Sequence, residues 1–182
     1  DTYYLSSSGT KKTGFQIISG GKYYFDEETG KAQYGLIKAN NGYTYYFDET
    51  GQAQTGLQTI HQELYYFNSN GIMQTGFQKI GDTRYFFHQE TGQAETGLIS
   101  ANGAKYLFDG KNGALTGLQQ YNGKTYYFGS TGVIQTGLIR DTENDTLYYF
   151  DTQDGTAQYG WVENNGYYYY LEKGGNYKTG FQ

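Results

Sequence analysis

The amino-acid sequence predicts an all-β fold, a β-solenoid of stacked β-hairpin repeats of about 20–21 residues each. Three observations predict it. A glycine followed by an apolar residue recurs at a nearly fixed spacing, an aromatic triplet recurs in phase with it, and turn-forming residues separate the two. Gly supplies 28 of the 182 residues, Tyr 23, Phe 11 and Pro none. Because one aromatic side chain buries roughly 150–250 Å², this polar chain can still build a core.

The glycine-apolar pair marks the start of each expected hairpin. Successive pairs lie 20 or 21 residues apart, except for one interval of 23 residues that contains a longer turn from Asp141 to Thr146. The pairs are Gly14-Phe15, Gly35-Leu36, Gly56-Leu57, Gly76-Phe77, Gly97-Leu98, Gly117-Leu118, Gly137-Leu138, Gly160-Trp161 and Gly180-Phe181. We therefore expect a single array of about nine units, partial at both ends, that spans residues 1–182 and is a fragment of a larger protein.

An aromatic triplet marks the second strand of each expected hairpin. The triplets are Tyr23-Tyr24-Phe25, Tyr45-Tyr46-Phe47, Tyr65-Tyr66-Phe67, Tyr85-Phe86-Phe87, Tyr106-Leu107-Phe108, Tyr126-Tyr127-Phe128, Tyr148-Tyr149-Phe150 and Tyr169-Tyr170-Leu171. Side chains alternate along a strand, so the first and third residues share one face and the middle residue lies on the other. The third position is always Phe or Leu, which indicates the core. The middle position, usually Tyr, is the better candidate for a groove between hairpins.

Turn residues separate the strands. Asn-Gly tolerates the positive φ angles of a type I′ hairpin turn, and four expected turns carry it: Asn41-Gly42, Asn102-Gly103, Asn122-Gly123 and Asn165-Gly166. A second loop, typified by Asp48-Glu49-Thr50-Gly51, leads to the next hairpin. We expect its Asp to accept hydrogen bonds from backbone N–H groups and its Gly to be left-handed. Because a two-stranded hairpin is marginal alone, the units are expected to stack.

Composition and charge argue against several functions. The net charge is −5 without a basic patch, so nucleic acid is not an expected partner. Cys is absent, and no apolar run is long enough to insert into a membrane. His61 and His88 lie in or beside turns of different units, so we expect no catalytic residues. We also expect no metal site, no cofactor and a monomeric fragment.

The unit "TGLQ…NGKTYYF…TG…QTG" resembles the cell-wall-binding or choline-binding repeat superfamily. In style it is similar to the glucan-binding repeats of glucansucrases and to the C-terminal repeats of large clostridial toxins. The resemblance covers essentially the whole chain. It implies a β-solenoid with ligands between consecutive hairpins, and a secreted or cell-surface protein of a Gram-positive-type bacterium.

The resemblance implies a cage of aromatic side chains in members that bind choline. That cage uses a Trp after the Gly and a Trp before the Tyr-Tyr pair, because π faces attract a quaternary ammonium. Here Leu or Phe usually follows the Gly, and a cation at Lys22, Arg84 or Lys105 would repel choline. Only the final complete unit restores cage-like aromatics, at Trp161, Tyr168 and Tyr170.

The resemblance to sugar-binding members implies a Tyr that stacks on a sugar, with polar side chains beside it. Five units combine a middle Tyr with a Gln two residues before the next repeat Gly, and an amide both donates and accepts hydrogen bonds. These candidate carbohydrate-binding residues are Tyr24, Gln33, Tyr46, Gln54, Tyr66, Gln74, Tyr127, Gln135, Tyr149 and Gln158. The units of Phe86 and Leu107 lack both features and are expected to bind worst.

The leading functional hypothesis is therefore a non-catalytic carbohydrate-binding module for an α-glucan, a bacterial wall polymer or a host glycan. Two alternatives remain. One is a choline-binding wall anchor, and the other is a structural spacer or protein-binding solenoid. The tyrosines and glutamines could equally serve packing and turns, because aromatic surfaces commonly join stacked repeats.

Overall fold

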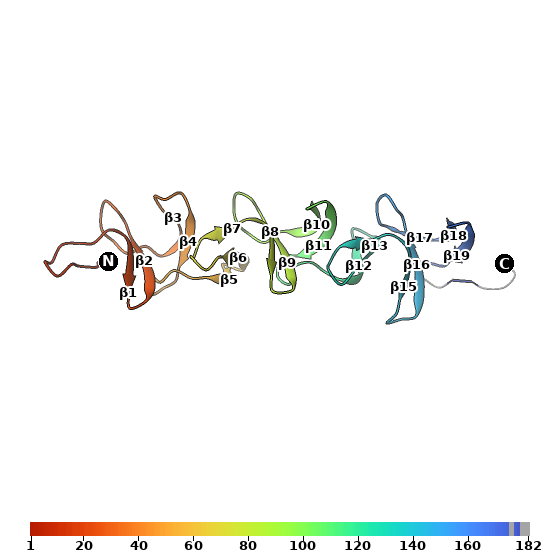
Figure 1. Ribbon diagram of the computed structural model, residues 1–182, viewed down its shortest axis with the longest axis horizontal. Helices are drawn as coiled ribbons and strands as arrows, with labels where there is room; N and C mark the ends of the chain where they lie inside the picture. Colours follow the sequence, from red (N-terminus) through yellow and green to blue (C-terminus); the bar gives the residue numbers. More distant parts are fainter. Residues whose placement is uncertain (175–176, 179–182) are drawn as a thin grey trace. The chain divides into compact units, whose positions relative to one another are not determined.

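The computed structural model describes residues 1–174 and 177–178. In this part of the chain there are 19 strands and no helix (Figure 1), so the predicted all-β class is confirmed. None of these residues forms a helix long and apolar enough to cross a membrane. The Gly180-Phe181 pair lies outside the described residues.

Each glycine-apolar pair within the described residues lies at or next to the start of a strand that pairs with the following aromatic strand, and we number these hairpins 1 to 8. Their strands are β1 (Gly14–Ile18) with β2 (Gly21–Phe25), β3 (Gly35–Lys38) with β4 (Thr44–Phe47), β5 (Gly56–Ile60) with β6 (Glu63–Phe67), β8 (Gly76–Ile80) with β9 (Thr83–Phe87), β10 (Thr96–Ala101) with β11 (Ala104–Asp109), β12 (Gly117–Tyr121) with β13 (Lys124–Phe128), β15 (Gly137–Asp141) with β16 (Thr146–Phe150), and β18 (Gly160–Asn164) with β19 (Tyr167–Leu171). Three hairpins gain a short third strand: β7 (Met73–Gln74), β14 (Ile134–Gln135) and β17 (Ala157–Gln158).

The two faces of the aromatic strand are used as the alternation predicts. In hairpin 2, Tyr45 and Phe47 are 2% and 0% exposed, whereas Tyr46 between them is only half-buried. Hairpins 3, 6 and 7 repeat this pattern. Hairpin 1 differs, because Tyr24 is buried rather than lining an open groove. The ring of Phe15, which stands where most units have Leu, lies 4.7 Å from the Tyr24 ring and covers it.

The middle residue of one triplet packs on the third residue of the next triplet. The ring centroids of Tyr24 and Phe47 are 6.2 Å apart, and those of Tyr46 and Phe67 are also 6.2 Å apart. The pairs Tyr66–Phe87, Phe86–Phe108 and Tyr127–Phe150 continue this packing. Each hairpin therefore buries its core face against a neighbour, as stacked repeats require.

Backbone hydrogen bonds reinforce the stacking. In hairpins 1, 3 and 4 the residue before the aromatic triplet presents its carbonyl to an alanine that follows the next hairpin. The carbonyl oxygen of Lys22 accepts from the N–H of Ala53 at 2.7 Å, and that of Leu64 accepts from Ala94 at 2.8 Å. These bonds fix the spacing of successive units independently of their side chains.

Three of the four Asn-Gly turns have the expected geometry, with both residues at positive φ: Asn102-Gly103, Asn122-Gly123 and Asn165-Gly166. The fourth prediction is wrong, because in Asn41-Gly42 only the glycine has a positive φ. Hairpin 2 carries one more residue between its glycine and its triplet than hairpin 6 does. That insertion lengthens the turn, which the Asn41 side chain stabilises by accepting from the N–H of Tyr43 at 3.1 Å and donating to the Tyr45 hydroxyl at 2.8 Å.

The second loop also follows the prediction. The Asp48 carboxylate accepts from the N–H and hydroxyl of Thr50, and Gly51 has a φ of 81°. The loop glycine has a second role that its φ does not reveal. A Cβ on Gly113 would meet the carbonyl oxygen of Arg84, so only glycine lets this loop approach the preceding hairpin.

The described chain forms two compact units. The first comprises Asp1–Gly76 and Phe87–Ala94, and the second comprises Phe77–Phe86 and the residues from Glu95 onward. The first unit contains hairpins 1 to 3. The second contains hairpins 5 to 8 and most of hairpin 4, from Phe77 to Phe86. Each unit carries its own buried aromatic clusters.

Candidate functional site

The predicted Tyr and Gln residues lie beside each other on paired backbone segments. Tyr66 pairs with Gln74, Tyr127 with Gln135, and Tyr149 with Gln158. The N–H groups of Gln33 and Gln54 donate to the carbonyls of Tyr24 and Tyr46 at 2.9 and 2.8 Å. The chain therefore returns next to the middle Tyr after each loop, which explains why the two features occur together.

All five glutamine amides bind the backbone of their own loops. Each Nε2 donates to the carbonyl oxygen two residues earlier, at 3.2 Å for Gln33, 3.1 Å for Gln54, 2.9 Å for Gln74, 3.2 Å for Gln135 and 3.3 Å for Gln158. None of the five lines the four cavities described below. In this structure the glutamines shape loops.

Two of the predicted tyrosines do line cavities between consecutive hairpins. We name the first the Tyr46 groove. It has a volume of about 290 Å³ and lies between the base of hairpin 2 and the turn of hairpin 3. Its walls are Tyr34, Gly35, Leu36, Tyr46, Phe47, Asp48, Glu49, Ile60 and His61. Tyr34 and Leu36 are 44% and 39% exposed, so aromatic and aliphatic surface is open to a ligand.

The second compact unit contains an equivalent cavity, which we name the Tyr127 groove. Its volume is about 490 Å³, and it lies between the base of hairpin 6 and the turn of hairpin 7. It is lined by Thr116, Gly117, Leu118, Gln119, Tyr127, Asp141, Thr142, Glu143 and Asn144. Leu118 and Tyr127 occupy the repeat positions of Leu36 and Tyr46. The repeat thus builds the same groove twice, with different polar residues at its rim.

The carboxylates at these grooves are held by hydrogen bonds. Burial raises the pKa of Asp48, but hydrogen bonds from the Thr50 hydroxyl and from the N–H groups of Gln52, Thr50 and Gly51 outweigh it and lower that pKa. In the Tyr127 groove, buried Asp141 accepts from the N–H of Glu143 at 3.1 Å and from the Asn144 amide at 2.8 Å. Both grooves therefore offer fixed acceptors beside an apolar wall.

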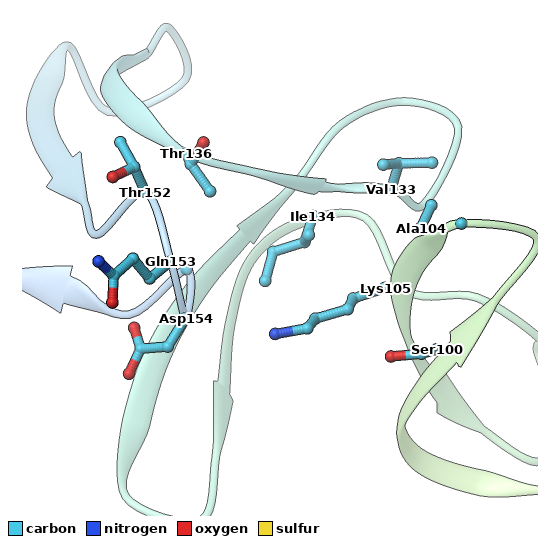
Figure 2. A pocket seen from close by; sticks show the side chains of 11 residues that line it. Ser100, Ala104, Lys105, Val133, Ile134, Thr136, Thr152, Gln153 and Asp154 are labelled. Atoms are coloured by element: carbon cyan, nitrogen blue, oxygen red, sulfur yellow. The ribbon is translucent and has the colours of Figure 1, made fainter.

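A second class of cavity lies at the turn end of two hairpins in the second unit. The cavity in Figure 2 has a volume of about 480 Å³, and Lys105 extends into it toward the loop of Gln153 and Asp154. Ser100, Thr136 and Thr152 add hydroxyls to its walls. A related cavity of about 450 Å³ lies at the turn end of hairpin 6. It is lined by Gln120, Gly123, Lys124, Thr125, Thr156, Ala157, Tyr159 and Lys173.

The final complete unit carries exposed aromatics where the sequence predicts them. Trp161 pairs with Tyr170 across hairpin 8, and their ring centroids are 5.2 Å apart at an interplanar angle of 68°. Tyr168 lies two residues before Tyr170 and therefore shares its face. Trp161 and Tyr168 are 63% and 73% exposed, so this aromatic cluster is open to a ligand.

Several lining residues escape the sequence analysis. Tyr34 and Tyr159 each replace the Thr that usually precedes the repeat Gly, and each lines a cavity. That replacement is a visible signal in the sequence. His61 and Thr142 give no such signal, because they enter the grooves from the turn of the following hairpin.

Stacked hairpins with grooves between them define a repeat-type binding module. The choline-binding repeat family model matches residues 12–54, 54–97 and 115–157, which together are more than half of the chain. The chain belongs to the choline-binding repeat family, so the predicted resemblance is confirmed. A comparison with curated proteins gives no match.

Solved structures support the solenoid of stacked hairpins. Choline-binding protein F of Streptococcus pneumoniae is 23% identical, with a TM-score of 0.70, over 97% of this chain and 61% of that one. The choline-binding domain of CbpL from S. pneumoniae is 24% identical, with a TM-score of 0.68, over 92% of this chain and 87% of that one. A structure of choline-binding protein F in the presence of a peptidoglycan analogue is 26% identical, with a TM-score of 0.50 and coverages of 97% and 55%. This chain therefore spans less than two thirds of choline-binding protein F.

Proposed function

We propose that this chain is a non-catalytic carbohydrate-binding module that recognises polysaccharide in the grooves between successive hairpins. The observation that carries the proposal is the recurrence of the Tyr46 and Tyr127 grooves at equivalent repeat positions in the two compact units. A polymer with repeating sugar units suits sites that recur along the chain, because several weak contacts add avidity through their effective concentration.

The chemistry of the grooves fits a neutral sugar. A pyranose ring has apolar C–H faces and a rim of hydroxyls, so it needs both an apolar wall and hydrogen-bonding groups. Leu36 and Tyr46 supply the wall of the first groove, and Glu49 and His61 supply polar groups at its rim. In the second groove Leu118 and Tyr127 are flanked by Gln119 and Thr142. The Tyr46 groove has the mainly apolar lining with a few polar groups that is typical of ligand sites, whereas the lining of the Tyr127 groove is mainly polar.

The comparisons favour a bacterial wall polymer within this class. One solved neighbour, choline-binding protein F, has been crystallised in the presence of a tetrasaccharide-pentapeptide analogue of peptidoglycan. On this proposal the chain is the repeat array of a larger secreted or cell-surface protein from a Gram-positive-type bacterium. An α-glucan and a host glycan remain the other sugar classes to test.

Choline is a second candidate ligand, for one position only. Trp161, Tyr168 and Tyr170 form an exposed aromatic cluster, and aromatic faces attract a quaternary ammonium by about 0.5–2 kcal/mol each. At the other hairpins the residue after the repeat Gly is Leu or Phe. A choline-specific array would require Trp at many of these positions.

Affinity electrophoresis through gels that contain wall polysaccharide, dextran or a mucin-type glycan tests the proposal. We expect at least one of these polymers to retard the chain. A Tyr34→Ala/Leu118→Ala variant removes exposed surface from both grooves, and we expect the retardation to fall by about tenfold. The matched control is Tyr43→Ala/Tyr167→Ala, because Tyr43 and Tyr167 are more exposed and line neither groove.

Two other outcomes would contradict the proposal. If no polymer retards the chain at any salt concentration, the spacer or protein-binding hypothesis takes its place. If Trp161→Ala alone abolishes retardation and free choline competes for it, the chain is a choline-binding wall anchor.

A further inference from the structure

The ammonium group of Lys22 lies inside an aromatic site that the first two hairpins form. Its Nζ is 4.6 Å from the centroid of the Phe15 ring and 4.5 Å from the centroid of the Tyr45 ring. It also donates a hydrogen bond to the carbonyl oxygen of Asn70 at 3.1 Å. Three segments of the chain therefore converge on one lysine.

The two rings are arranged to hold a cation. Their centroids are 4.9 Å apart at an interplanar angle of 61°. The ammonium lies within about 6 Å of both centroids, the range of a cation–π contact. Tyr45 is 2% exposed, which fixes one wall. Burial lowers the pKa of Lys22, which indicates that the rings and the backbone replace part of its water.

The pattern of the repeats separates this lysine from an ordinary surface lysine. Phe follows the repeat Gly in hairpins 1 and 4, and a cation precedes the Tyr pair or its equivalent in both, as Lys22 and Arg84. The rings of Phe77 and Tyr106 repeat the aromatic pair, with centroids 5.2 Å apart. Hairpin 5 has Lys105 at the same position, but Leu98 replaces the aromatic residue. There the lysine extends into a cavity whose lining contains no aromatic side chain (Figure 2).

We propose that Phe15 and Tyr45 form a cation-binding site that Lys22 occupies from within the chain, which closes this position to external quaternary ammonium ligands. The lysine thereby determines ligand specificity at the contact between hairpins 1 and 2. It supplies the charge that an external cation would bring, and its removal opens the site. This inference concerns cations and is independent of the sugar proposal.

An NMR titration with tetramethylammonium chloride, at constant total chloride, tests the inference. The background is Trp161→Ala, which removes the exposed aromatic cluster of hairpin 8. We expect Lys22→Ala to bind tetramethylammonium at least about tenfold more tightly than its parent, with shifts at the Phe15 and Tyr45 rings. Lys105→Ala is the matched control. It removes a lysine from the same repeat position without an aromatic pair, so it should gain no binding.

The inference is overturned if folded Lys22→Ala binds no more tightly than its parent, or if Lys105→Ala gains as much. The unaltered chain provides a second measurement if Lys22→Ala fails to fold. Protons above an aromatic ring resonate upfield, so the ε-methylene protons of Lys22 should lie upfield of those of Lys105. Equal chemical shifts at the two lysines would place the Lys22 ammonium outside the rings and would equally overturn the inference.

Discussion

Two neighbouring residues of one strand should separate stability from ligand binding. Phe47 is fully buried, and the rings of Tyr24 and Tyr45 lie 6.2 and 6.1 Å from it. Truncation to Ala leaves a cavity at this position, and such Phe→Ala changes cost about 3–5 kcal/mol. For a chain of this length each kcal/mol lowers the unfolding midpoint by roughly 2–4 °C. Phe47→Ala should therefore lower the midpoint by roughly 6–20 °C.

Tyr46→Ala should be milder in stability and stronger in binding. Tyr46 is half-buried, and one ring, that of Phe67, stacks on it at 6.2 Å. An aromatic pair contributes about 0.5–1.5 kcal/mol beyond its burial, so we expect a loss of about 1–2 kcal/mol in the free energy of unfolding. The same change removes part of the apolar wall of the Tyr46 groove.

Thermal melts followed by circular dichroism, together with affinity electrophoresis below both midpoints, measure the two effects. We expect Phe47→Ala to lose more stability, and Tyr46→Ala to lose more polysaccharide retention. If Tyr46→Ala unfolds the chain more readily than Phe47→Ala does, the assignment of the two strand faces is wrong. If Tyr46→Ala keeps the retention of the unaltered chain, the Tyr46 groove is not a ligand site.

Three further perturbations have defined outcomes. Gly113→Ala brings a Cβ against the carbonyl of Arg84 at a φ of 78°. It should destabilise the chain by several kcal/mol more than Gly123→Ala, whose Cβ meets nothing within 4 Å, and chemical denaturation of both variants measures the difference. The pKa of Asp48 lies below its ordinary value of 3.8, so its carboxylate stabilises the fold at pH values above 3.8 and loses this effect as the pH falls through the folded-state pKa. In Asp48→Asn the free energy of unfolding should therefore depend less steeply on pH in this acid range. Trp161 is the sole Trp, so added choline should change the intrinsic fluorescence if it binds hairpin 8, and an unchanged spectrum at saturating choline would remove that candidate.

The period of the chain predicts most of the fold, because each repeat carries its own strand and turn signals. The burial of Phe47 beside the half-buried Tyr46 follows from the alternation of side chains along a strand. Local departures are harder to predict. One inserted residue changes the turn at Asn41, and one Phe in place of Leu buries Tyr24.

The candidate site is only partly predictable from the sequence. Tyr46 and Tyr127 line grooves as expected, whereas the glutamines bind their own loops. The pairing of Tyr with Gln in the sequence follows from the return of the backbone beside the middle Tyr after each loop. The contacts of Lys22 need the structure, because Tyr45 and Asn70 lie in the following repeats.

The most direct test of the account is a crystal structure of the chain with an oligosaccharide of whichever polymer retards it. We expect sugar density against the Tyr46 or Tyr127 ring, within the grooves that also contain Glu49 or Thr142. We expect none at Leu107, which is 4% exposed. Sugar bound chiefly in the units of Phe86 or Leu107, or bound with both grooves empty, would contradict the account.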